Sequence, residues 1–159
     1  MKTLHFSTQI NAPADIVWAT MLDASTYGQW TSVFSPGSHF KGSWLKGSEI
    51  RFLGDSDEHE PMDGLVGVII EHRPHEFVSI EYTGVIMHGS VDTESDYARR
   101  IAGAQENYTF SESDGVTTLT VDLDVDDQEA EMFAQMWPKA LDKLTEIAEA
   151  AAQARHPAP

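Results

Sequence analysis

Alternation of apolar and polar residues predicts a sheet that takes up most of the chain. Leu4, Phe6 and Ile10 alternate with polar residues, and the segment 116–126 keeps the same period of two over a longer run. This period is typical of strands with one buried face. Weaker patterns predict further strands at 38–45, 48–53, 63–73, 76–86 and 105–112.

Four other segments are predicted to be helical. Apolar residues recur at helical spacing in 127–154, and 14–22 and 23–32 are two short helices, whereas 87–104 is polar and has room for one short helix at 95–101. Asn11 is the expected N-cap of the helix at 14–22, with Pro13 in its first turn. The segment 127–154 is the longest and includes Pro138. A proline inside a helix removes one hydrogen bond and costs about 3 kcal/mol, so we expect a kink near Met136 or a break into two helices.

Strand, two short helices, about six strands and a long apolar-faced helix follow one another, an order that predicts an α+β fold. Along this order the chain carries a series of short motifs: 10–13 (INAP), 17–18 (VW), Trp30, 47–50 (GSEI), 64–66 (GLV), 73–74 (RP), 106–110 (ENYTF) and 137–144 (WPKALDKL). In these motifs the chain resembles the START-like (SRPBCC) superfamily, and within it the branch named after the C-terminal domain of the heat-shock-protein-90 ATPase activator.

This resemblance implies the helix-grip fold. In that fold a curved antiparallel sheet of about six to seven strands wraps around a long C-terminal helix, and two short helices follow the first strand. We expect residues 1–154 to form a single domain and residues 155–159 to be a frayed tail.

Composition narrows the possible partners. The chain of 159 residues has 26 Asp and Glu against 10 Lys and Arg, a formal net charge of −16. Phosphate binding needs clustered basic residues, so nucleic acid is excluded as a partner and an anionic membrane surface is disfavoured. The absence of cysteine excludes disulfides, thiolate metal sites and a cysteine nucleophile.

The sequence also bears on the cellular location and the oligomeric state of the protein. The N-terminus lacks an apolar run of signal-peptide length, and the longest apolar stretch, 66–70, is too short to span a bilayer. We therefore expect a cytoplasmic protein with no membrane insertion. Both a monomer and a homodimer are compatible with the sequence.

Aromatic and methionine residues are the candidate lining of a cavity between the sheet and the long helix. Space enclosed by such a fold is a ligand site when side chains leave it open and an ordinary core when they fill it. Both interpretations are open. The candidate ligand-binding residues are Trp30, Phe40, Phe52, His72, Tyr82, Met87, Tyr108, Phe133, Met136 and Trp137.

Polar residues near this lining are few. His72 shares parity with 66, 68 and 70 and is expected to point inward, either as a pocket base or as a histidine bonded to backbone. His88 is expected either to line an entrance or to lie in an exposed loop. Arg99-Arg100 either meets a ligand carboxylate or makes salt bridges on a helix surface. The sequence leaves the direction of Glu106 undecided.

No metal, cofactor or catalytic residue is predicted. The segment 122–126 carries three aspartates as a calcium loop does, but Asp127 stands where glycine is needed and Phe133 where a glutamate is needed. The acidic segment 55–60 lacks a spacing that would hold a metal. Nucleophile, phosphate-loop and dinucleotide motifs are also absent from the sequence.

The leading hypothesis is therefore binding or carriage of a small hydrophobic or aromatic molecule, without chemistry. One alternative is a cyclase-type or hydrolase-type enzyme that acts in the same cavity, with His72, Tyr82 or Glu106 as acid or base. The other is a partner that regulates a chaperone ATPase or takes part in a stress response, which the family name implies.

Overall fold

The computed structural model describes residues 1–54 and 62–155. One antiparallel sheet of eight strands forms a layer, and its strand order is β1-β8-β7-β5-β4-β3-β2 with β6 paired to β5. The strands are β1 (Lys2–Ile10), β2 (His39–Gly42), β3 (Glu49–Leu53), β4 (Met62–Arg73), β5 (Phe77–Met87), β6 (Ser90–Asp92), β7 (Gln105–Ser113) and β8 (Val116–Val125).

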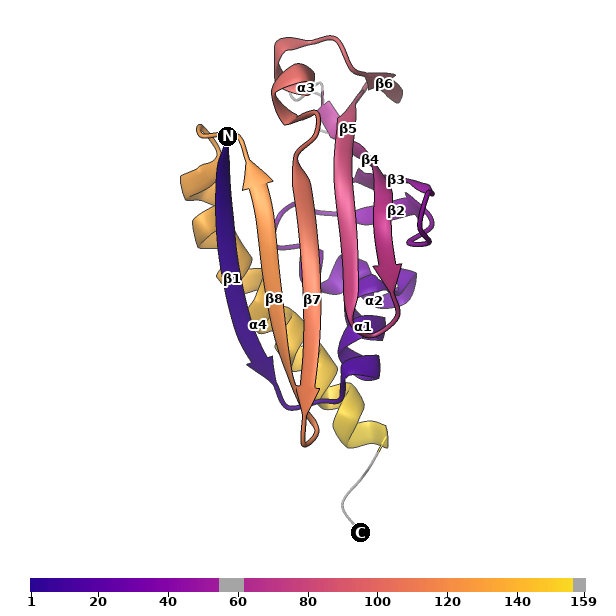
Figure 1. Cartoon of the computed structure of the whole chain (residues 1–159), viewed down its shortest axis with the longest axis vertical. Helices are drawn as coiled ribbons and strands as arrows, with labels where there is room; N and C mark the ends of the chain where they lie inside the picture. The colour runs from indigo at the N-terminus through magenta and orange to yellow at the C-terminus, as the bar shows by residue number, and fades with distance from the viewer. Residues whose placement is uncertain (55–61, 156–159) are drawn as a thin grey trace.

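Three helices lie on one face of this sheet, namely α1 (Ala14–Leu22), α2 (Ala24–Thr31) and α4 (Ala130–Arg155). A fourth helix, α3 (Asp96–Ile101), lies at one end of the sheet (Figure 1). In Figure 1 the long helix α4 passes behind β1, β8 and β7, and α1 and α2 continue the helical layer behind the other strands. This arrangement confirms the predicted helix-grip fold, a curved open sheet with a long C-terminal helix.

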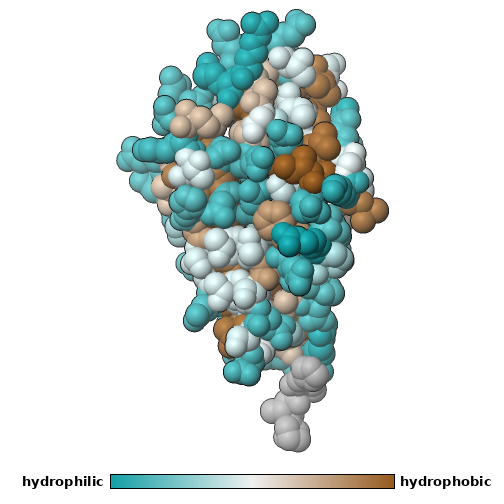
Figure 2. All heavy atoms as spheres, in the orientation of Figure 1, coloured by the Kyte–Doolittle hydropathy of each residue, from teal (hydrophilic) through white to brown (hydrophobic). Residues whose placement is uncertain are grey.

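The opposite face of the sheet is open and polar, as the alternation in β1 and β8 predicts. Every second residue of β8 is buried, and its partner β1 alternates in the same sense. Figure 2 shows that this open face is mostly hydrophilic. The hairpin between β7 and β8 turns at Asp114 and Gly115, both at positive φ, which is the backbone that an Asp-Gly turn favours.

The start of α1 differs from the prediction. Asn11 does not cap the helix; Pro13 is the N-cap residue and makes no side-chain hydrogen bond to the helix. Instead, the Glu112 carboxylate of β7 accepts a hydrogen bond of 2.6 Å from the Ala14 backbone N–H. A carboxylate from a distant strand thus satisfies a free N–H at the positive end of the helix, a contact that no local pattern shows.

The predicted break in the C-terminal helix is wrong. α4 runs as one helix through Pro138, and its apolar face buries Trp137, Ala140, Leu141 and Leu144 against the sheet. The predicted kink stays untested. The helix also includes Arg155, which had been assigned to a frayed tail.

Two further differences concern the sheet. β6 is a three-residue strand that the sequence did not predict. Register shifts between Val66 and Gly67 and between Ile69 and Glu71 interrupt β4 and change which of its residues share a face. A bulge of this kind reverses the alternation on one side of it, so simple parity fails across it.

Candidate functional site

Glu106 is an acidic residue that the fold places on the inner face of the sheet, among buried apolar residues. It stands in β7 opposite Ile80 of β5 on one side and opposite Leu123 of β8 on the other, and both of these neighbours belong to the buried core. The direction that the sequence left undecided is therefore inward, toward the helical layer. Part of the residue stays accessible, because Glu106 is half-buried whereas Tyr82 and Tyr108 are buried.

Two tyrosine hydroxyls bind the Glu106 carboxylate. The Tyr82 hydroxyl of β5 donates to Oε1 at 3.1 Å, and the Tyr108 hydroxyl of β7 donates to Oε2. Each carboxylate oxygen has two lone pairs, so each retains one after accepting one bond. The carboxylate is held in a fixed position and still has acceptor capacity for another donor.

Burial governs the electrostatics of this group. Desolvation raises the pKa of Glu106, and the hydrogen bonds from Tyr108 and Tyr82 lower it by a smaller amount. Desolvation also raises the pKa of the Tyr27 hydroxyl, and the nearby Glu106 charge raises it further. The same two causes, in the same order, raise the pKa of Tyr82 and Tyr108 well above the ordinary value. All three tyrosines are therefore neutral hydrogen-bond donors at physiological pH.

Aromatic rings pack against the two tyrosines that hold the carboxylate. The Tyr27 ring centroid lies 5.1 Å from Phe40, 5.6 Å from Trp30 and 6.2 Å from Phe52. The contacts continue from Phe52 to Tyr82 at 6.1 Å. We call this set the aromatic layer; its members are Tyr27, Trp30, Phe34, Phe40, Trp44, Phe52, Tyr82, Tyr108, Phe133 and Trp137.

No cation offsets the Glu106 charge within the described residues 1–54 and 62–155, where none of the ion pairs involves this carboxylate. Every lysine and arginine of the chain is exposed except Arg51, which is half-buried and donates to Glu49 at 2.8 Å. The site therefore consists of a carboxylate, neutral hydroxyls and aromatic rings.

Most of the residues predicted to line a ligand site gather in one place. Trp30, Tyr82, Tyr108 and Trp137 are buried members of the aromatic layer, and Phe40, Phe52 and Phe133 are half-buried members of it. Met87 is half-buried and packs against the same core. Met136, one position before Trp137, is half-buried; because the layer is defined by contacts between aromatic rings, this methionine is not a member of it.

His72 points inward, but the reason given by the sequence was wrong. Its partner across the β4–β5 ladder is the buried Val78. On the other side of the register shifts, the residues paired with the inner face of β5 are Leu65, Gly67 and Ile69, so His72 does not share a face with 66, 68 and 70 as its parity predicted. The His72 Nδ1 lies 2.7 Å from the Trp44 carbonyl oxygen. This contact agrees with the second of the two alternatives for His72, a histidine that is hydrogen-bonded to backbone.

The remaining polar candidates lie away from the layer. His88 is exposed at positive φ. Arg100 donates to Asp126 at 2.8 Å on the surface, as expected for helix-surface salt bridging. In the segment 122–126, for which a calcium site was rejected, Asp122 contacts His5 and Asp124 accepts from Thr3. The acidic segment 55–60 lies outside the described residues.

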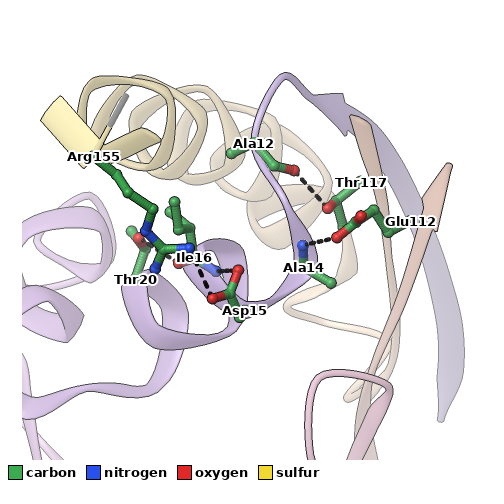
Figure 3. Close-up of polar contacts among 8 residues, drawn as sticks. All are labelled: Ala12, Ala14, Asp15, Ile16, Thr20, Glu112, Thr117 and Arg155. Atoms are coloured by element: carbon green, nitrogen blue, oxygen red, sulfur yellow. Dashed lines mark hydrogen bonds and ion pairs between the residues drawn. The ribbon is translucent and has the colours of Figure 1, made fainter. Parts of the chain in front are cut away.

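A surface pocket of about 230 Å³ lies outside the aromatic layer, between α1, the start of α2 and the end of α4. Figure 3 shows Arg155 reaching from α4 to Asp15 of α1, and the guanidinium donates to the carboxylate at 2.9 Å. The hydrogen bond from Arg155 is the largest influence on Asp15 and lowers its pKa. Both partners are partly exposed, so the pair contributes little to stability.

The predicted hollow between the sheet and α4 stays a prediction, since the described rings there pack against one another. Three members of the layer, Tyr27, Phe34 and Trp44, are missing from the predicted lining. Helical spacing placed Tyr27 and Trp30 on one helix, and Trp44 shares strand parity with Phe40. These signals were available, but only the three-dimensional packing shows that the residues meet.

Solved structures of other bacterial proteins have the same fold. Protein MLL2253 from Mesorhizobium loti superposes with a TM-score of 0.69 at 14% identity, over 94% of this chain and 98% of that one. The Aha1 dimer from Colwellia psychrerythraea gives 0.66 at 12% identity, over 94% and 97%. CalU16 from Micromonospora echinospora gives 0.63 at 18% identity, over 92% of this chain and 65% of that one. At these identities the likeness concerns the fold.

A family model described as "Activator of Hsp90 ATPase homolog 1-like protein" matches residues 11–149. The match spans all elements from α1 to most of α4. A comparison with curated proteins finds no match. Within the described residues, the structure contains no helix that is both long and apolar enough to cross a membrane.

Proposed function

The chain belongs to the Activator of Hsp90 ATPase homolog 1-like family, and we propose that it binds a small, mainly apolar or aromatic molecule between the sheet and α4. The observation that carries this proposal is the aromatic layer built around one hydrogen-bonded carboxylate, Glu106. Apolar walls with a few placed polar groups are the usual composition of small-molecule sites.

Entry to this site requires side chains to move, because the rings now contact one another. Phe40 lies in β2, the edge strand of the sheet, and Trp44 follows that strand; both are half-buried members of the layer. An edge strand is bonded on one side only, so its side chains move at a smaller cost than those of the central strands. A ligand thus enters past these two rings and displaces them.

The four tryptophans provide a test with an internal control. Trp30, Trp44 and Trp137 belong to the aromatic layer, whereas Trp18 packs on His72, His75 and Phe110 outside it. Four indole N–H signals, assigned by single Trp→Phe substitutions, are followed by NMR while small aromatic compounds are added. We expect the signals of Trp30, Trp44 and Trp137 to shift together and that of Trp18 to stay. Shifts confined to Trp18, or none at all with a broad panel, would contradict the proposal.

A second candidate function is acid–base catalysis on the bound molecule. The observation in its favour is the raised pKa of Glu106, caused by burial, together with the neutral hydroxyls of Tyr82 and Tyr108 at hydrogen-bonding distance. A carboxyl group with a raised pKa takes up and releases protons closer to neutral pH. Glu106→Gln keeps the shape of the side chain, so retention of ligand binding with complete loss of turnover would identify this function.

A further inference from the structure

The charge of Glu106 has no partner in the described part of the protein, although burying a carboxylate is costly unless it is paired. Two hydroxyl donors compensate part of this cost and leave acceptor capacity on both oxygens. Such a group is stabilised most by a donor that also carries a positive charge, because charge-assisted hydrogen bonds are about twice as strong as neutral ones.

The rings around the carboxylate favour the same kind of ligand. Tyr27, Phe52 and Tyr82 form a continuous series of contacts, with centroids 6.2 Å and 6.1 Å apart, next to the Glu106 carboxylate. Aromatic faces attract cations, and the attraction grows when the cation is removed from water. Removal of water on binding therefore strengthens both the ring contacts and the contact with the carboxylate.

Charge elsewhere in the molecule acts in the same direction. With a formal net charge of −16, the chain attracts cations over its surface and repels anions. No lysine or arginine is buried beside the layer to receive a carboxylate or phosphate, since nine of the ten are exposed and the tenth, Arg51, is bonded to Glu49. A fatty acid or phospholipid headgroup therefore has no counter-charge at this site.

We infer that the molecule bound between the sheet and α4 is an organic cation, an apolar or aromatic compound with a protonated amine that donates to the Glu106 carboxylate. This inference rests on the proposed binding function and adds the chemical class of the ligand. The amine lies beside Tyr82 and Tyr108, and its apolar part packs against Phe52 in the space left by the displaced rings of Phe40 and Trp44.

The test compares three compounds of nearly equal shape, namely 4-phenylbutylamine, 4-phenyl-1-butanol and 4-phenylbutyrate. They present a cation, a neutral hydroxyl and an anion on the same apolar body. Affinity is measured from the indole shifts of the layer tryptophans at pH 7 and at two salt concentrations. We expect 4-phenylbutylamine to bind at least about tenfold more tightly than 4-phenyl-1-butanol, and 4-phenylbutyrate to bind most weakly.

Variants separate the buried carboxylate from surface charge. Glu106→Gln is expected to abolish the preference for the amine, and Glu106→Asp to retain part of it. Asp122→Asn removes an acid from the open face of the sheet, where Asp122 contacts His5, and is expected to leave the preference unchanged. Circular dichroism establishes that each variant is folded before its affinity is compared.

The outcomes distinguish failure of this inference from failure of the proposed binding function. Equal binding of amine and alcohol by the wild-type protein, with shifts at Trp30, Trp44 and Trp137, overturns the inference and supports the binding function. A preference that survives in Glu106→Gln, or that disappears in high salt, also overturns it, because surface charge then accounts for the preference. Binding of none of the three compounds overturns both, and the wild-type comparison decides even if Glu106→Gln does not fold.

Discussion

The Tyr82 hydroxyl donates a 3.1 Å hydrogen bond to the Glu106 carboxylate, and through it two strands meet at one polar point inside an aromatic layer. Tyr82 stands in β5 and Glu106 in the adjacent β7. Buried polar groups of this kind are stable only when they are paired. Replacing either partner therefore leaves the other without its hydrogen bond.

Glu106→Gln should remove a pH dependence of stability. Burial raises the Glu106 pKa above the ordinary 4.5, so the folded protein holds this proton to a higher pH than the unfolded chain does. The contribution of Glu106 to the free energy of unfolding is thus greatest below pH 4.5 and declines as the pH rises through the raised value. Glutamine does not titrate, so the stability of the variant relative to wild type should increase across that interval.

Urea unfolding at a series of pH values from 4 to 8 measures this difference. Glu146→Gln, on the exposed side of α4, is the control for losing a carboxylate at the surface. A relative stability of Glu106→Gln that stays constant, or that falls as the pH rises, would show that the folded protein does not destabilise the ionised carboxylate.

Trp30 should be the most sensitive aromatic position of the layer. Its indole Nε1–H donates to the Met21 carbonyl at 3.1 Å, its ring packs on Tyr27 and Trp137, and it is 1% exposed. Trp30→Ala is expected to lower the free energy of unfolding by about 3–5 kcal/mol. Trp30→Phe keeps an aromatic ring but leaves the Met21 carbonyl unpaired, at a cost of about 1–3 kcal/mol.

Chemical denaturation compares these variants with Leu45→Ala, at a side chain that is 62% exposed. The control is expected to change stability by less than about 0.5 kcal/mol. If Trp30→Phe is as stable as the wild type, the indole hydrogen bond does not contribute to folding.

Pro138→Ala should stabilise the protein. The proline lies inside the continuous helix α4, where it cannot donate to the Ala134 carbonyl one turn earlier. Alanine restores that bond and has the highest helix propensity. A gain of about 1–3 kcal/mol is expected, below the full difference in propensity when water already satisfies the exposed Ala134 carbonyl.

Lys139→Ala is the matched control for Pro138→Ala, since Lys139 is the exposed neighbour in the same helix. Thermal unfolding of the two variants should show an increased midpoint for Pro138→Ala alone. A decrease for Pro138→Ala would indicate that the proline supports the bend or the packing of α4, which the sequence predicted as a kink.

The parts of the fold that the sequence predicts correctly are those with long, regular patterns of apolar residues. The period of two in β1 and β8 and the helical spacing in α4 each extend over many residues, and such long patterns identify elements from sequence. β6 has only three residues and carries no comparable pattern. The face occupied by His72 depends on the bulges of β4, which arise from pairing with β5 and leave no trace in the parity of β4 itself.

The aromatic residues of the candidate site were predictable from the sequence, but the position of Glu106 among them was not. Aromatic residues are buried wherever they can be, so their inventory alone indicated most of the layer. Glu106 stands between Gln105 and Asn107, and three polar residues in succession show no alternation from which a direction follows. Its orientation is fixed by the pairing with Ile80 and Leu123, a long-range property of the sheet.

Gly64→Ala should destabilise the sheet near the aromatic layer more than an ordinary glycine substitution does. A Cβ at Gly64 would lie 1.9 Å from the Phe52 carbonyl oxygen, which is backbone of the paired strand β3 and has no freedom to swing away. β3 and β4 must separate locally, and Phe52 moves with them. We expect a loss of about 1–3 kcal/mol in the free energy of unfolding.

Gly103→Ala is the comparison that separates this clash from the general cost of replacing glycine. A Cβ at Gly103 has no neighbour within 4 Å, but the residue has a φ of +88°, so alanine there experiences only backbone strain. That strain costs about 1–2 kcal/mol. Because the clash moves Phe52 and the strain does not, Gly64→Ala alone should shift the indole signal of Trp44, whose ring centroid lies 5.7 Å from that of Phe52. An unshifted Trp44 signal in a destabilised Gly64→Ala variant would show that β3 absorbs the added methyl group without moving the layer.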